Sequence, residues 1–212
     1  MPAESPRVFI SYAHDSEEHK RTVLEFGELL RAQLGIDAHV DEWYANQRRD
    51  WAAWAIEQLE SADYVLAIAS PKFRERADGR SAAHEGRGSQ FEGAMMRNKM
   101  TEDRATWIAK ILPVVLPGMT ISGIPEFLLP YSSTHYIISR ITPDGVVELR
   151  RVLGRVPRHP LPPLGTPPPI PAGNVVPPIQ QSVKPVNTGN RVRVTKSKAR
   201  IIAGGDVHSH GE

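Results

Sequence analysis

The sequence predicts an α/β domain in which a parallel β-sheet carries helices on both faces. Short, β-branched apolar runs alternate along the chain with longer stretches whose apolar residues recur at helical spacing. Such short runs suit strands that are buried on both faces. Alternation of strands and helices favours parallel pairing with right-handed crossovers.

Five strands and four helices are expected in the first three quarters of the chain. The second strand alternates apolar and polar residues, as an edge strand does, whereas the first and third are the most apolar. With the second strand at an edge and the first and third strands at the centre, the strand order is 2-1-3-4-5, which is that of a flavodoxin-like sheet. The expected elements are strand 7–11, helix 16–34, strand 36–41, helix 51–62, strand 64–69, helix 89–98, strand 111–116, strand 135–138 and helix 143–153.

This topology places a crevice at the carboxyl edge of the sheet. Open α/β sheets bind ligands where the strand order reverses, which here lies between the first and third strands. Segments 11–15 and 70–92 then flank that crevice. The irregular stretch 74–88 is expected to be a loop, and the polar stretch 42–49 another.

The composition changes sharply near residue 154. Beyond it the chain has no Phe, Tyr or Trp, and 11 of its 19 prolines lie between Pro157 and Pro185. We therefore expect a folded domain over 6–154 and a disordered, polyproline-like linker over 155–190. A basic tail over 191–212 could form a short strand when it pairs with a partner. Nucleic-acid binding by this tail is the minority interpretation, because basic runs are usually solvated.

Several classes of protein are excluded by composition. The chain has no cysteine, so neither a disulfide framework nor thiolate chemistry is available. The amino terminus lacks the pattern of a signal peptide, and no apolar run approaches the ~18 residues of a membrane span. We expect a cytoplasmic protein without membrane contact. No resident cofactor or metal is predicted, since His208 and His210 are too isolated to indicate a metal site.

Several motifs resemble a SEFIR domain of bacterial type, a branch of the Toll/interleukin-receptor (TIR) superfamily. They are Val8-Phe-Ile-Ser-Tyr-Ala-His-Asp-Ser16, Asp41-Glu-Trp43, Ala62-Asp-Tyr-Val-Leu66 and Ser70-Pro-Lys-Phe73. They occur in the order and spacing of that family, and the resemblance covers about residues 6–153.

The resemblance implies a flavodoxin-like fold and two alternative functions. Animal relatives are adaptors that self-associate through this domain, whereas many bacterial TIR-type domains are NAD glycohydrolases coupled to a sensor protein. In those enzymes a glutamate at the start of the third helix is catalytic, and the matching residue here is Glu92. NAD would be a substrate and not a cofactor. The side chains expected to contact it are Ser11, Tyr12, His14, Asp15, Asp41, Trp43 and Ser70.

The role of Glu92 stays open between catalysis and helix capping. Because NAD already carries a cationic nicotinamide, the leaving group departs neutral, and one fixed carboxylate suffices to stabilise the ribosyl cation. The pattern from Ser89 to Glu92 is also that of a capping box. In addition, Gly88 stands where TIR enzymes usually carry a tryptophan.

Three tryptophans have different expected roles. Trp51 and Trp54 share one helix face, which favours packing in the core. Trp43 lies in the polar loop beside the expected crevice, where a lid or partner contact and ordinary packing are both open.

Overall fold

The computed structural model describes residues 5–82 and 86–170. Contacts between Cα atoms divide the chain into a compact unit that ends at Pro162 and a second unit that begins at Pro163. The compact unit thus continues beyond residue 154, where the sequence predicts the domain to end. In the second unit, residues 163–170 are exposed and form neither helix nor strand. The rest of the predicted linker and the possible strand in 191–212 lie outside the described residues.

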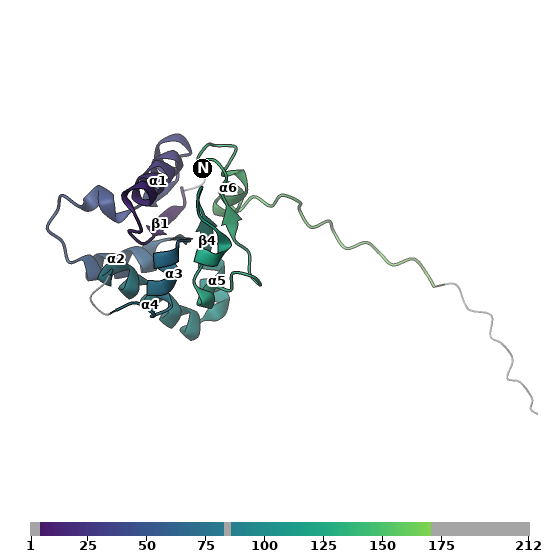
Figure 1. The fold of residues 1–212 in the computed structure, drawn as a ribbon. Coiled ribbons are helices and arrows are strands. Elements are labelled where there is room, and N and C mark those ends of the chain that lie inside the picture. The colour runs from purple at the N-terminus through teal and green to yellow at the C-terminus, as the bar shows by residue number, and fades with distance from the viewer. Residues whose placement is uncertain (1–4, 83–85, 171–212) are drawn as a thin grey trace, which may run out of the picture. The chain divides into compact units, whose positions relative to one another are not determined.

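A five-stranded parallel sheet forms the centre of the compact unit (Figure 1). Its order is β2-β1-β3-β4-β5, which confirms the predicted flavodoxin-like topology. Ser11, the last residue of β1, pairs with Ala67 near the end of β3, so these two central strands end side by side. The strands are β1 (Arg7–Ser11), β2 (Asp37–His39), β3 (Tyr64–Ile68), β4 (Ile111–Val115) and β5 (Tyr136–Ile137).

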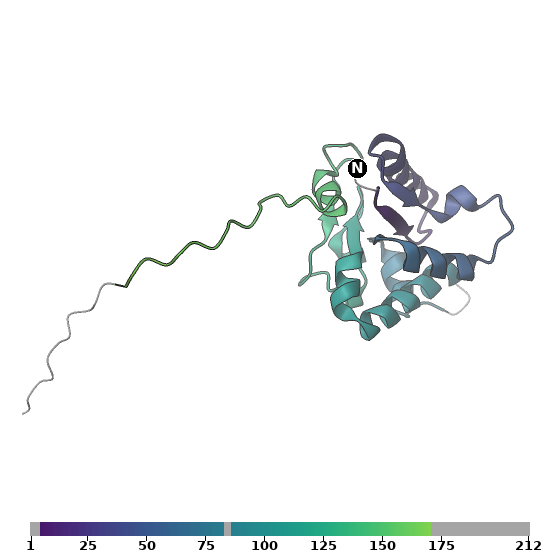
Figure 2. The same cartoon turned by 180° about the vertical axis from the view of Figure 1, so that it is seen from behind.

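Helices cover both faces of the sheet (Figure 2). The helices are α1 (Glu17–Glu28), α2 (Trp51–Ser61), α3 (Pro71–Ala77), α4 (Arg87–Glu102), α5 (Arg104–Lys110) and α6 (Val147–Leu153). Successive strand residues point to opposite faces. Val8 and Ile10 therefore join the core beneath α1 and α6, whereas Phe9 joins the core beneath α2 to α5.

Short helical segments complete the compact unit. They are the π-helix η1 (Leu29–Gln33) and the 3₁₀ helices η2 (Asp41–Tyr44), η3 (Ile121–Gly123) and η4 (Glu126–Leu128). η1 continues α1, so that helical structure extends over nearly all of the predicted range 16–34. Gly35 follows with φ of +67°, the left-handed conformation that ends many helices. η2 occupies the start of the stretch that was predicted to be a loop.

Two short helices were not predicted. α3 extends into the stretch 74–88, for which the sequence predicts a loop, and Ser70 and Pro71 provide its helix-start chemistry. The Ser70 hydroxyl accepts a hydrogen bond from Phe73 N at 3.1 Å, and Pro71 occupies the first helical position. α5 is capped in the same way by Asp103, whose carboxylate accepts from Thr106 N at 3.1 Å.

Two predicted helices have different limits from those expected. α4 begins before Ser89 and continues past residue 98, and its buried residues include Met96 and Met100. α6 begins later than predicted. Before it, the Thr142 hydroxyl accepts from Gly145 N at 3.2 Å and so closes a turn.

The two tryptophans of α2 are in different environments. Trp54 is 4% exposed and meets the ring of Phe9 edge to face, with ring centroids 5.7 Å apart. Trp51 is 41% exposed and touches the edge of Trp54. The expectation that both lie in the core is therefore wrong for Trp51, because the helix turns its first residue away from the sheet.

We expect Trp54→Ala to lower the free energy of unfolding by about 3–5 kcal/mol, the usual effect of truncating a buried aromatic. Trp51→Ala should lower it by about 1 kcal/mol or less, because that side chain remains largely in solvent. Urea unfolding of both variants measures the difference. Equal losses would contradict the placement of Trp51 at the surface.

Candidate functional site

Glu92 contacts the end of β1 at the carboxyl edge of the sheet. Ser11 is 1% exposed, and its hydroxyl donates a hydrogen bond of 2.5 Å to Glu92 Oε2. The two residues are 81 positions apart in the chain and come from β1 and α4. The predicted neighbours Ser11 and Glu92 are therefore brought together as expected.

Glu92 does not cap its own helix. α4 begins at Arg87 after Gly86, which adopts φ of +57°, so Ser89 is already the third helical residue. The Ser89 hydroxyl donates to Gly86 O at 3.1 Å and is not an N-cap acceptor. The capping-box interpretation is therefore wrong, and the carboxylate of Glu92 is directed to the end of β1.

The environment of Glu92 favours its neutral form. Burial raises the pKa of its carboxyl from an ordinary 4.5 to about 8, and the negative charge of Asp41 adds to this. The hydrogen bond from Ser11 acts in the opposite direction and is outweighed. Some of the Glu92 surface still reaches solvent. At neutral pH the carboxyl is therefore mostly protonated.

Tyr12, His14 and Asp41 form a second group beside this pair. The ring of Tyr12 lies 5.0 Å from that of His14, and His14 Nε2 lies 3.4 Å from Asp41 Oδ2. Interaction with Asp41 raises the pKa of His14. Burial, followed by the charges of Asp41 and Glu42, raises the pKa of the Tyr12 hydroxyl above its ordinary range. The fold therefore gathers negative charge at this edge.

Asp15 and Ser70 join two elements of the fold. The Asp15 carboxylate accepts from the Ser70 hydroxyl at 2.7 Å and from Lys72 N at 3.1 Å. The Ser70 hydroxyl in turn accepts from Phe73 N, as described above. Both oxygens of Asp15 and the hydroxyl of Ser70 are thus used within the protein. Their predicted role in contacting a substrate has no support from this geometry.

Trp43 packs against α1. Its indole is half-buried next to the core, and a Cβ built at Gly27 would stand only 3.2 Å from it. Gly27 leaves room for this ring, a pairing that nothing in the sequence signals. Of the two interpretations of Trp43, packing is the one that the geometry supports.

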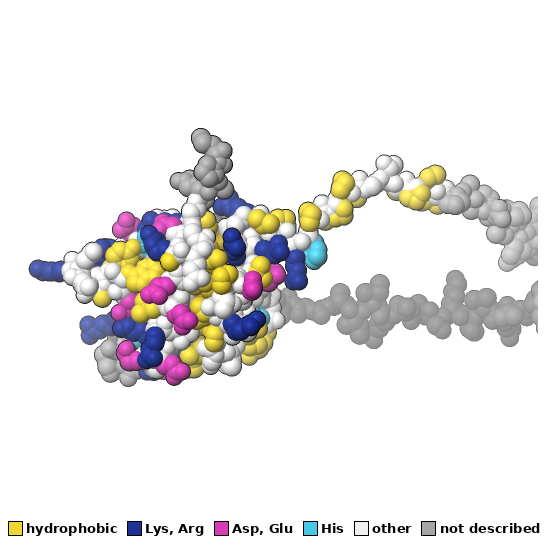
Figure 3. Space-filling model, turned by 90° about the horizontal axis from the view of Figure 1, so that it is seen from above, with side chains coloured by type: hydrophobic (Ala, Val, Ile, Leu, Met, Phe, Trp, Pro, Cys, Tyr) yellow, Lys and Arg dark blue, Asp and Glu magenta, His cyan; other side chains and the backbone are white. Residues whose placement is uncertain are grey.

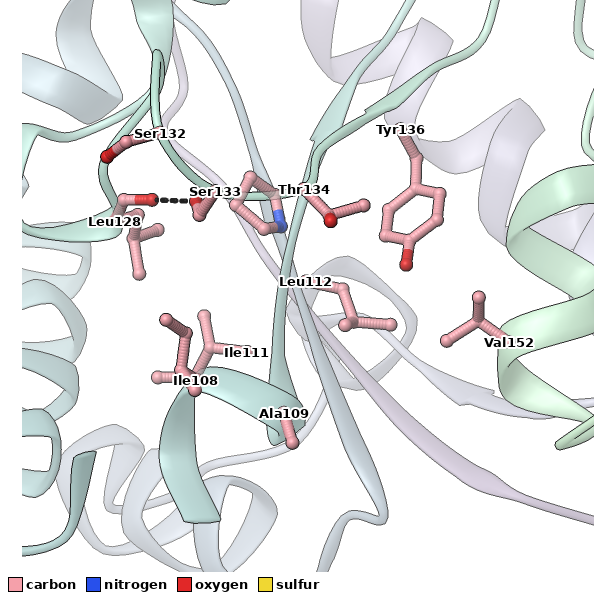
Figure 4. A pocket seen from close by; sticks show the side chains of 11 residues that line it. Ile108, Ala109, Ile111, Leu112, Leu128, Ser132, Ser133, Thr134, Tyr136 and Val152 are labelled. Carbon is pink, nitrogen blue, oxygen red and sulfur yellow. Dashed lines mark hydrogen bonds between the residues drawn. The ribbon is translucent and has the colours of Figure 1, made fainter. Parts of the chain in front are cut away.

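Two hollows lie away from Glu92. One, of about 460 Å³, is lined by Ile108 and Leu128 on one side and by Tyr136 and Val152 on the other, with Leu112 between them (Figure 4). The other, of about 1150 Å³, lies at the amino ends of β1 and β3. Neither includes Glu92, Ser11 or Tyr12. In addition, no helix within residues 5–82 and 86–170 is both long and apolar enough to cross a bilayer.

The fold is that of a flavodoxin-like α/β domain. The SEFIR domain family matches residues 6–141, and the chain belongs to that family. A crystal structure of a prokaryotic SEFIR domain is 25% identical, with a TM-score of 0.55 over 76% of this chain and 100% of that one. Interleukin cytokine receptor-related protein 1 of Caenorhabditis elegans is 45% identical over 40 residues, which are 19% of this chain and only 5% of that protein.

We expect the stability of the wild type, relative to Glu92→Gln, to fall as pH rises from about 4.5 to about 8. Below this window the folded and unfolded states both hold the proton. Within it the unfolded state ionises first, so folding is penalised progressively, by an amount on the order of a few kcal/mol. Urea unfolding of both proteins at pH 4, 6 and 8.5 measures the difference. A difference that stays constant with pH would contradict the raised pKa.

Proposed function

We propose that this chain is a signalling module that acts through homotypic association of its SEFIR domain. The observation that carries this proposal is an exposed basic and aromatic surface on residues 45–51, which connect η2 to α2 and include the first residue of α2. This segment projects from the compact unit (Figure 1), and Lys or Arg side chains stand at its tip (Figure 3). Membership of the SEFIR family supports association with a like domain.

The segment 45–51 is held in shape by its own contacts. The guanidinium of Arg49 lies 5.0 Å from the ring centre of Tyr44 and 5.9 Å from that of Trp54. The same guanidinium donates to Gln47 Oε1 at 2.6 Å. Arg48 and Trp51 remain exposed on this fixed base. A surface that is ordered before contact loses less conformational entropy on binding.

A complementary surface is available on α1 of a second copy. Its exposed carboxylates are Glu17, Glu18, Glu25 and Glu28. Residues 1–154 hold 18 basic and 22 acidic residues and so carry a net charge of −4, whereas segment 45–51, with Arg48, Arg49 and Asp50, carries +1. Contact between two different surfaces is heterologous and builds rings or open assemblies.

We expect Arg48→Glu and Trp51→Ala to weaken self-association of the full chain by about tenfold or more, since each removes one component of this surface. Sedimentation velocity over a range of concentrations, at low and at physiological salt, measures the association. Arg140→Glu is the matched control, because it makes the same charge change at an exposed site away from segment 45–51.

Charge exchange adds a more specific test of the same interface. Mixing Arg48→Glu with Glu25→Arg should restore association that neither variant shows alone. The proposed surface is wrong if Arg140→Glu disperses the chain as strongly as Arg48→Glu does, or if the wild type stays monomeric throughout.

A second candidate function is hydrolysis of NAD at its N-glycosidic bond. The observation that favours it is that the Glu92 carboxyl contacts Ser11 at the carboxyl edge of the sheet and is not used in a helix cap. In this reaction water adds to the ribosyl carbon, the bond to nicotinamide breaks, and the products are ADP-ribose, nicotinamide and a proton. Glu92 would stabilise the ribosyl cation in its ionised form.

We expect nicotinamide release to rise with pH towards about 8, because only ionised Glu92 stabilises a cation. Glu92→Gln should abolish release while the fold is retained. Ser11→Ala removes the hydrogen bond that favours the carboxylate, so it should shift the pH profile to higher pH. The assay measures nicotinamide from NAD and the full chain between pH 6 and 9, corrected for cleavage without protein. Full activity of folded Glu92→Gln would rule out the catalytic assignment, and an inactive assembled wild type would leave association as the function.

A further inference from the structure

We propose that His14, Asp41 and Glu42 bind a divalent first-row transition cation such as Zn²⁺ or Mn²⁺. The three side chains come from the ends of two neighbouring strands. His14 follows β1, and Asp41 and Glu42 open the 3₁₀ helix η2 after β2. The proposal is independent of both proposed functions, because it concerns metal binding alone.

The spacing of the three side chains suits one ion. One ligand atom from each residue lies within 4.8 Å of those of the other two. His14 Nε2 is 3.4 Å from Asp41 Oδ2 and 3.9 Å from Glu42 Oε1. Two ligands about 2.1 Å from a shared ion stand roughly 3.0–3.4 Å apart in octahedral or tetrahedral geometry. Small side-chain movements therefore complete the site.

The orientation of Asp41 is fixed by its own loop. Its Oδ1 accepts a hydrogen bond from Glu42 N at 2.8 Å, and this bond leaves Oδ2 directed to His14. An oriented carboxylate beside an imidazole needs little rearrangement to bind an ion. The imidazole also selects the class of ion, because Mg²⁺ and Ca²⁺ prefer all-oxygen sites.

An independent observation comes from Tyr12. This residue is 5% exposed, and within the described part of the chain its buried hydroxyl makes no hydrogen bond of ordinary geometry. Its ring lies 5.0 Å from that of His14, so the residue borders the three proposed ligands. Buried hydroxyls almost always have a partner. A water in the coordination shell of an ion at this site would supply one.

Lys20 competes with the proposed ion for the carboxylate of Glu42. Its Nζ lies 2.7 Å from Glu42 Oε1, so an internal cation already neutralises that carboxylate. Both side chains are partly exposed to solvent, and such pairs contribute little stability. A divalent ion with three ligands is expected to displace Lys20 from Glu42. Removal of the lysine should consequently strengthen metal binding.

The test uses the full chain with His208→Ala and His210→Ala, so that tail histidines do not contribute. Calorimetric titration with Zn²⁺, and loss of the free Mn²⁺ signal in electron paramagnetic resonance, should show one site. His14→Ala and Asp41→Asn should each weaken binding at least about tenfold. The matched controls His159→Ala and Glu126→Gln, at exposed sites elsewhere, should not change it.

Two further variants distinguish an ion site from an ordinary surface ion pair. Lys20→Met should tighten binding several-fold, and Tyr12→Phe should weaken it several-fold. Zn²⁺ should also raise the melting temperature of the background protein and leave that of His14→Ala unchanged. The proposal is overturned if His14→Ala and Asp41→Asn bind both ions as the background protein does, or if neither ion binds at all.

Discussion

The carboxylate of Asp15 holds together the elements on which the candidate site depends. It binds the Ser70 hydroxyl and the backbone of Lys72, while Lys72 Nζ donates to Asp15 O at 3.1 Å. The loop after β1 and the start of α3 are thereby joined at three points. That loop carries Tyr12 and His14, so this interaction helps to set their positions.

The contact between the loop after β1 and α3 also bears on the position of Glu92, because α3 packs closely against α4. α3 packs on α4 where Gly93 meets Ala77, and a Cβ at Gly93 would stand only 2.4 Å from the Cα of Ala77. Only glycine permits this approach. Because Glu92 precedes Gly93, the contact places its carboxyl against Ser11. Contacts thus join Asp15 to α3, α3 to α4, and α4 to the end of β1 at the carboxyl edge of the sheet.

Much of the fold could be predicted because strands β1, β3 and β4 are short β-branched runs whose burial leaves few alternatives. The short helices escaped prediction because α3 and α5 have only seven residues each, too few for a clear amphipathic period. The candidate site was harder to predict from the sequence than the fold. Ser89 and Glu92 have capping-box spacing, and only the earlier start of α4 at Arg87 shows that the spacing is coincidental.

The turn η2 shows why tertiary structure, and not local sequence, decides the role of each polar residue here. Asp41 at its start acts on His14, Tyr12 and Glu92, and Tyr44 at its end stacks against Arg49 of the projecting segment. Its third residue, Trp43, anchors it to α1 at Gly27. The partner proposed for segment 45–51 would contact the residues next to the turn that carries Asp41. One turn of helix thus lies between the segment proposed for association and the carboxyl edge of the sheet.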